Sequence, residues 1–100
     1  MVAAMRILLG GGTQASLSRI IGKCDGLGVA LSYATSEEEA GAWKRKAKGA
    51  DVAIIRTGRV SHRAWLQVKA WVPLVVMVNE CGEEALIAAV VRAAQQRSQA

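Results

Sequence analysis

The sequence predicts a small α/β domain built on a doubly wound parallel sheet of four strands, with helices on both faces. Four apolar runs alternate with four stretches whose apolar residues recur at helical spacing, and this alternation requires parallel strands joined by right-handed crossovers. Two of the runs, residues 52–55 and 74–78, are apolar without interruption, as expected for strands covered on both faces. The 100 residues predict a single domain over 1–100, because a second hydrophobic core would have too little chain.

The first strand is expected over residues 5–9 and ends at the three glycines of positions 10–12. Thr13 can cap the helix that follows. Helical spacing places the apolar residues of this helix on one face: Leu17, Ile20, Ile21 and Cys24. Cys24 is therefore interpreted as a core residue and not as a reactive thiol.

The second strand is expected over residues 27–34, with Val29, Leu31 and Tyr33 on one side. Ser36 and Glu39 match a capping box, which predicts that the second helix begins there. The lysines and arginine of residues 44–48 suit the negative end of this helix. Its apolar stripe is thin, comprising Ala40, Trp43 and Ala47, and predicts light packing.

The third strand is expected over residues 51–57, in the centre of the sheet. Ser61 is a suitable N-cap for the third helix, and Pro73 prevents that helix from continuing. Residues 74–78 are interpreted as a second interior strand. The last helix begins near Glu83 and is expected to bury Leu86, Ile87, Val90, Val91 and Ala94.

If the first strand lies near the middle, the simplest strand order is 2-1-3-4, and the winding direction reverses between strands 1 and 3. Ligands of such sheets bind at that switch point, beyond the carboxyl ends of the strands. Two loops flank it, residues 10–14 and 57–62. The predicted ligand-binding residues are therefore Gly11, Gly12, Thr13, Gln14, Thr57, Arg59, Ser61 and His62.

The glycine loop can attract phosphate or carboxylate, because backbone amides at a helix start favour anions. It lacks the lysine and spacing of a P-loop and does not match the GxGxxG dinucleotide pattern, so the glycines can equally well serve only a tight turn. An inward-pointing Arg56 or Arg59 would favour the anion site. His62 is the single histidine, and it can contact a ligand or simply hold its loop together. With no acid nearby to orient it, we expect a binding module and not an enzyme.

Two alternatives use other residues. His62 with Cys81, which follows the fourth strand, could hold a metal ion or haem. Nucleic acid could bind the basic segments 44–48 and 56–69, since no acid lies between Asp51 and Glu80 and the net charge is +5. That charge can also serve solubility alone.

The two cysteines lack the paired spacing of zinc or redox motifs, which predicts reduced thiols and a cytoplasmic protein. The apolar runs are too short for a membrane helix, which takes about 20 residues. An apolar edge strand and the three tryptophans predict a homodimer.

The stretch ADVAIIRTGRVSHRAWLQVKAW resembles a group of small bacterial domains, domain-of-unknown-function family twenty-three twenty-five. The pattern is carried by Asp51, the apolar run after it, Thr57, Ser61, His62, Val68 and Lys69. The resemblance implies a Rossmann-like or flavodoxin-like fold with Thr57, Ser61 and His62 in the family's site, and it implies no reaction. The prediction is a regulatory or assembly module that binds a small anionic ligand, for example a nucleotide.

Overall fold

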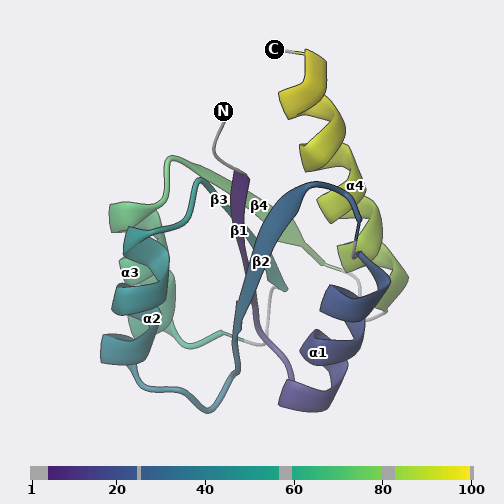
Figure 1. The fold of residues 1–100 in the computed structure, drawn as a ribbon. Helices are drawn as coiled ribbons and strands as arrows, with labels where there is room; N and C mark the ends of the chain where they lie inside the picture. The colour runs from purple at the N-terminus through teal and green to yellow at the C-terminus, as the bar shows by residue number, and fades with distance from the viewer. Residues whose placement is uncertain (1–4, 25, 57–59, 80–82, 100) are drawn as a thin grey trace.

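The computed structural model describes residues 5–24, 26–56, 60–79 and 83–99, which form one α/β sandwich (Figure 1). Its parallel sheet has the order β2-β1-β3-β4, which confirms the predicted doubly wound architecture. The strands are β1 (Met5–Gly10), β2 (Val29–Ala34), β3 (Val52–Arg56) and β4 (Leu74–Val78). The helices are α1 (Gln14–Lys23), α2 (Ala40–Lys48), α3 (His62–Trp71) and α4 (Glu83–Gln99).

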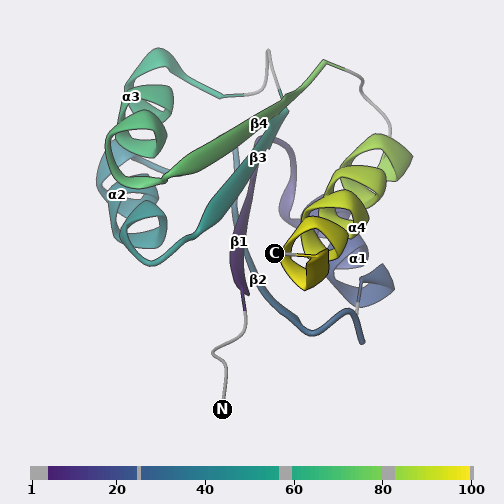
Figure 2. The ribbon, with the colours of Figure 1, turned by 90° about the horizontal axis from the view of Figure 1, so that it is seen from above.

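Two helical layers cover the sheet, α1 with α4 on one face and α2 with α3 on the other (Figure 2). Alternate residues of β1 enter the two layers, Ile7 and Leu9 facing α1 and α4 while Leu8 faces α2 and α3. Every residue of β3 is buried, so the prediction of a central third strand is confirmed. Cys24 is buried under α1 as predicted, and burial raises the pKa of its thiol.

β4 lies at the edge of the sheet, as the predicted order 2-1-3-4 requires, and Leu74 and Met77 remain 48% and 45% exposed. The interpretation of its uninterrupted apolar run as an interior strand is therefore wrong. An uninterrupted apolar run describes both a covered strand and an apolar edge, and the strand order alone distinguishes them.

The close packing of α2 also differs from the light packing that its sequence predicts. Trp43 is 1% exposed and is the largest fully buried side chain in the described part of the chain. Its ring lies against Gly10 at the end of β1, where an added Cβ would be 2.6 Å from Trp43 Cη2. Gly10 is therefore a packing residue, whereas Gly11 and Gly12 adopt positive φ angles of 90° and 135° and form the turn. Within the described ranges, no helix is both long and apolar enough to cross a bilayer.

Candidate functional site

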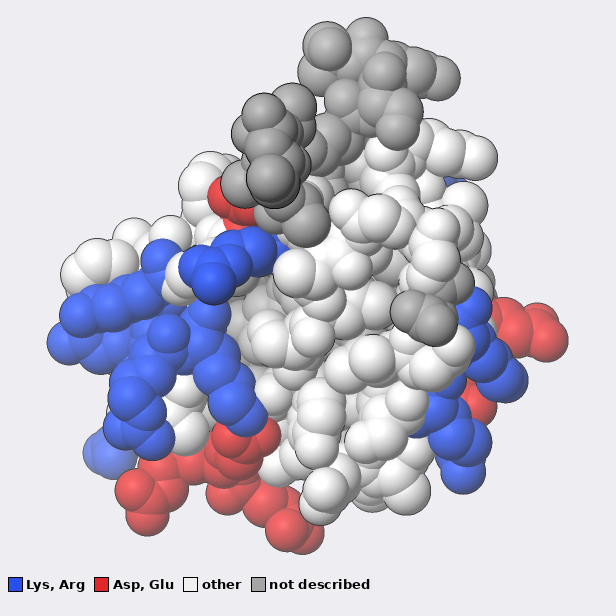
Figure 3. All heavy atoms as spheres, viewed as in Figure 1, with Lys and Arg blue, Asp and Glu red and all other residues white. Residues whose placement is uncertain are grey.

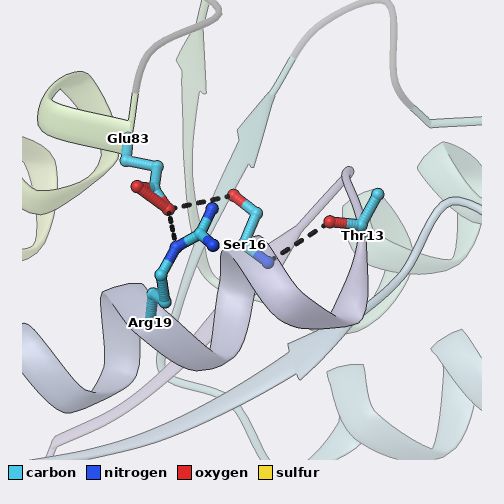
Figure 4. Close-up of polar contacts among 4 residues, drawn as sticks. All are labelled: Thr13, Ser16, Arg19 and Glu83. Atoms are coloured by element: carbon cyan, nitrogen blue, oxygen red, sulfur yellow. Dashed lines mark hydrogen bonds and ion pairs between the residues drawn. The ribbon is translucent and has the colours of Figure 1, made fainter.

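The strand order brings the carboxyl ends of β1 and β3 together, with Gly10 paired to Ile55. β1 leads into α1 on one face and β3 leads toward α3 on the other, so the sheet has its switch point here. Thr13 caps α1 as predicted, and its Oγ1 accepts a hydrogen bond of 3.2 Å from the Ser16 amide (Figure 4). The predicted glycine loop thus stands at the switch point with the start of α1.

Ser36, which follows β2, holds this loop in place. The Gly12 amide donates a 2.8 Å hydrogen bond to Ser36 Oγ, and the Ser36 amide donates a 3.1 Å bond to the Gly12 carbonyl. The predicted capping box is therefore wrong: α2 begins at Ala40, and its N-cap Glu39 makes no side-chain capping bond. The position of the Ser36 hydroxyl just beyond β2, the strand beside β1, could have indicated this role. The capping pattern with Glu39 suggested a different use of the same side chain.

Replacing Ser36 with alanine is expected to lower the free energy of unfolding by about 1–3 kcal/mol, because the buried Gly12 amide loses its acceptor. Urea denaturation followed by tryptophan fluorescence measures this change. Ser32→Ala is the matched control, since Ser32 is exposed on β2 and should change stability by no more than about 0.5 kcal/mol. Equal effects of the two substitutions would contradict the proposed anchoring role of Ser36.

Arg56, the last residue of β3, is the one charged side chain buried among the described residues, with 6% of its surface exposed. It follows Val52 and Ile54 on the face covered by α1 and α4. Its Nη1 lies 3.3 Å from the position that a Cβ on Gly12 would occupy, so the guanidinium lies against the glycine loop. Nε and Nη2 are fully buried, and neither forms a hydrogen bond within residues 5–24, 26–56, 60–79 and 83–99.

Among the described residues, nothing offsets the burial of Nε and Nη2 of this cation. A buried cation whose N–H groups are unpaired costs several kcal/mol of desolvation energy. The start of α1 adds positive potential of the same sign, because the first amides of a helix have no intrahelical acceptor. Thr13 accepts only one of them, from Ser16, within the contacts described for this turn. An anion between Arg56 and the start of α1 would accept hydrogen bonds from the guanidinium and from the first helix amides. Its negative charge would offset the positive potential of both groups.

The remaining predicted site residues divide into two groups. Thr57, Arg59 and Cys81 lie outside the described residues. Ser61 and His62 stand at the start of α3, where Ser61 Oγ accepts a hydrogen bond of 3.2 Å from the Ala64 amide, which confirms the predicted N-cap. His62 is exposed and is not among the residues that line the hollows found in the described structure.

Two adjoining hollows extend from the glycine loop along the edge of β2. The first has a volume of about 340 Å³ and is lined by Gly12, Thr13, Gln14, Thr35, Ser36 and Glu37. The second has a volume of about 520 Å³ and is lined by Gln14, Ile21, Leu31, Ser32, Tyr33, Thr35, Glu38 and Lys46. Because Gln14 and Thr35 line both, the hollows form one groove, which we call the β2 groove.

An ion pair borders the far end of the β2 groove. Lys46 Nζ donates to the Tyr33 carbonyl at 2.7 Å and lies 2.5 Å from the Glu38 carboxylate. Burial raises the pKa of Glu38, but the hydrogen bonds from Lys46 and the Thr35 amide, together with the Lys46 charge, outweigh burial and hold the pKa below its usual value. Glu38 is therefore an anion neutralised by Lys46, whereas the neighbouring Glu37 is exposed.

A second ion pair, between Arg19 and Glu83, links α1 to the first turn of α4. Glu83, in the first turn of α4, accepts a hydrogen bond of 2.9 Å from Arg19 and one of 3.5 Å from Ser16 (Figure 4). The hydrogen bond from Arg19 lowers the pKa of the Glu83 carboxyl, which therefore stays charged near neutral pH. These contacts join the first turns of α1 and α4.

One group of basic side chains lies over α2, and further basic side chains lie on the opposite side of the same view (Figure 3). Lys44 and Lys48 lie 5.8 Å and 4.6 Å from the centre of the Trp71 ring, within the range of cation–π contacts. Arg56, which the nucleic-acid hypothesis included in the basic surface, is buried, so that part of the hypothesis is wrong.

Metal ligation receives no support from the described side chains, among which no three His, Cys, Asp or Glu residues cluster closely enough to hold an ion.

No family model matches the chain, and no curated protein or solved structure is significantly similar to it. The resemblance to the family of unknown function stays a prediction.

Proposed function

We propose that this protein is a non-enzymatic binding module that holds a small anionic ligand at the switch point between β1 and β3. The observation that carries the proposal is Arg56, a buried guanidinium against the glycine loop with two donor atoms that have no partner among the described residues. The start of α1 supports it, because its free amides favour negative charge. Gly12 supports it as well, because it lines the first hollow and a Cβ added to it would lie 3.3 Å from Arg56 Nη1.

Inorganic phosphate is the probe that tests this proposal, read out as thermal unfolding followed by tryptophan fluorescence. A ligand that binds only the folded state stabilises it by about 2.7 kcal/mol at a hundredfold excess over Kd. For a domain of this size, that corresponds to a rise in Tm of about 10 °C or more. We expect a saturable rise for the wild type and none for Arg56→Met.

Arg45→Met is the matched control, because Arg45 is exposed on α2 and its replacement removes the same charge far from the glycine loop. It should retain the wild-type response. Phosphate also stabilises folded proteins by exclusion from their surface, and this effect should be the same in all three proteins. A response that is equal in the wild type and Arg56→Met, or absent from both, would refute the proposal.

We further propose that the protein is cytoplasmic and homodimeric, with a regulatory or assembly role. Large apolar side chains of β4 support the dimer, because Leu74 and Met77 are 48% and 45% exposed. Exposed apolar edge strands favour pairing with a second chain. Met77→Lys is expected to sediment as a folded monomer in analytical ultracentrifugation, whereas the wild type sediments as a dimer. Equal sedimentation coefficients for the wild type and Met77→Lys would contradict a dimer through this edge.

A further inference from the structure

The β2 groove begins at Gly12, the residue against which the Arg56 guanidinium lies, so the groove restricts what else a ligand held at this loop can carry. The groove then passes Gln14 and Thr35 into the second hollow. A ligand anchored by an anionic group at the loop would extend its remaining atoms along the edge of β2.

The first hollow suits a hydroxyl-rich group. Four of the residues that line it carry side-chain oxygens: Thr13, Thr35, Ser36 and Glu37. Glu37 is exposed, and the ion pairs and charged hydrogen bonds described for this loop involve its neighbour Glu38 instead. An ionised carboxylate accepts hydrogen bonds from a vicinal diol and repels a second phosphate. Figure 3 shows acidic side chains gathered beneath the basic ones, where the chain connects β2 to α2.

The second hollow suits a flat, partly apolar group. Ile21, Leu31 and Tyr33 are half-buried side chains that also pack against the core under α1. Ser32, Glu38 and Lys46 also line this hollow, with Lys46 Nζ 5.5 Å from the centre of the Tyr33 ring, and their polar groups can fix the orientation of a heterocycle. Its volume of about 520 Å³ lies within the usual range for small-molecule sites.

We infer that the ligand is a nucleoside 5′-monophosphate, with its phosphate at Arg56 and the α1 start, its ribose in the first hollow and its base in the second. This inference rests on the proposed anion site and names its ligand class. A single phosphate is specified because Arg56 provides one buried cation, while the groove beyond it carries the Glu37 carboxylate. Di- and triphosphates would place further negative charge beside that carboxylate.

The test is isothermal titration of the full chain with inorganic phosphate, adenosine, the four ribonucleoside monophosphates and adenosine diphosphate. At least one monophosphate should bind about tenfold or more tightly than inorganic phosphate, within the range that base stacking on an aromatic ring contributes. The diphosphate should bind more weakly than the matching monophosphate. The 2′,3′-dideoxy monophosphate should also bind more weakly, because it lacks the diol.

Three variants distinguish the parts of the groove. Tyr33→Leu keeps an apolar side chain and should reduce monophosphate affinity toward that of phosphate. Glu37→Lys changes an exposed loop residue and should reverse the preference for monophosphate over diphosphate. Arg56→Met should abolish binding of every anion.

The outcomes separate the two proposals. Phosphate binding that depends on Arg56, with no gain for any monophosphate, would overturn the nucleotide inference and leave the anion site standing. Monophosphate affinity that is unchanged by both Tyr33→Leu and Glu37→Lys would also overturn it. Absence of phosphate and nucleotide binding alike would refute both proposals.

Discussion

Arg56→Met is expected to raise the free energy of unfolding of the ligand-free protein by about 1–4 kcal/mol. Most substitutions of a buried residue destabilise a protein, but this one removes a guanidinium with two unpaired buried donors and replaces it with an apolar side chain of similar length. Replacing buried charges with apolar residues of similar volume is often neutral or stabilising by this amount. Urea denaturation in a buffer without phosphate or other oxyanions measures it.

The order of stability should reverse in the presence of ligand. Saturating phosphate adds binding energy to the wild type, whereas Arg56→Met gains only the exclusion effect that both proteins share, so the two stability curves cross as the phosphate concentration rises. Arg56→Lys retains the charge without the guanidinium fork and should respond to phosphate more weakly than the wild type. If Arg56→Met is instead less stable than the wild type in oxyanion-free buffer, Arg56 stabilises the folded protein through a structural contact. That result would contradict the anion site at Arg56.

Gly10→Ala is expected to destabilise the protein by about 3 kcal/mol, although it adds a single methyl group. The new Cβ would lie 2.6 Å from Ile55 Cδ1 and 2.6 Å and 2.7 Å from Trp43 Cη2 and Cζ3. Neither the fully buried indole nor the close-packed strand beneath it has room to move, and overpacking a core costs about 1–3 kcal/mol or more. Urea denaturation provides the measurement.

Gly22→Ala is the control for this substitution. Gly22 lies in α1 with no atom within 4 Å of an added Cβ, so alanine there should stabilise the helix by about 0.5–1 kcal/mol. Trp43→Phe removes the ring atoms nearest to Gly10, and Gly10→Ala should cost about 1 kcal/mol less in that background. Strictly additive effects of the two substitutions would contradict direct contact between Gly10 and Trp43.

The predictions that succeeded rest on local patterns or on rules of chain handedness. Thr13 and Ser61 cap α1 and α3 because a hydroxyl can satisfy a nearby helix amide without any help from the rest of the fold. The strand order 2-1-3-4, predicted for a first strand near the middle of the sheet, is confirmed. Right-handed crossovers, which depend on the L-configuration of the residues and not on their particular partners, then place helices on both faces. The same rules located the switch point and the glycine loop beside it.

The predictions that failed depend on residues distant in the sequence. Ser36 has the spacing of a capping box with Glu39, yet the fold places it beside Gly12, 24 residues away, and the loop amide is its partner. Residues 74–78 have the composition of an interior strand, but no strand in the described part of the chain lies beyond them. In both cases the local pattern is real, and the tertiary neighbour decides which use it has.

By itself, the sequence determined the order of elements, the doubly wound sheet, the N-caps of α1 and α3 and the placement of a glycine loop at the switch point. Periodicity, capping and crossover handedness act over short segments or on every L-chain, so they can be read without knowing which distant residues meet. Only the tertiary structure decided that Gly10 makes room for Trp43, that Ser36 anchors the loop and that Arg56 lies buried beneath Gly12. Whether a side chain is buried and whether its donors find partners depends on elements that are distant in the sequence. For Arg56, this burial without partners among the described residues is the strongest indication of a ligand.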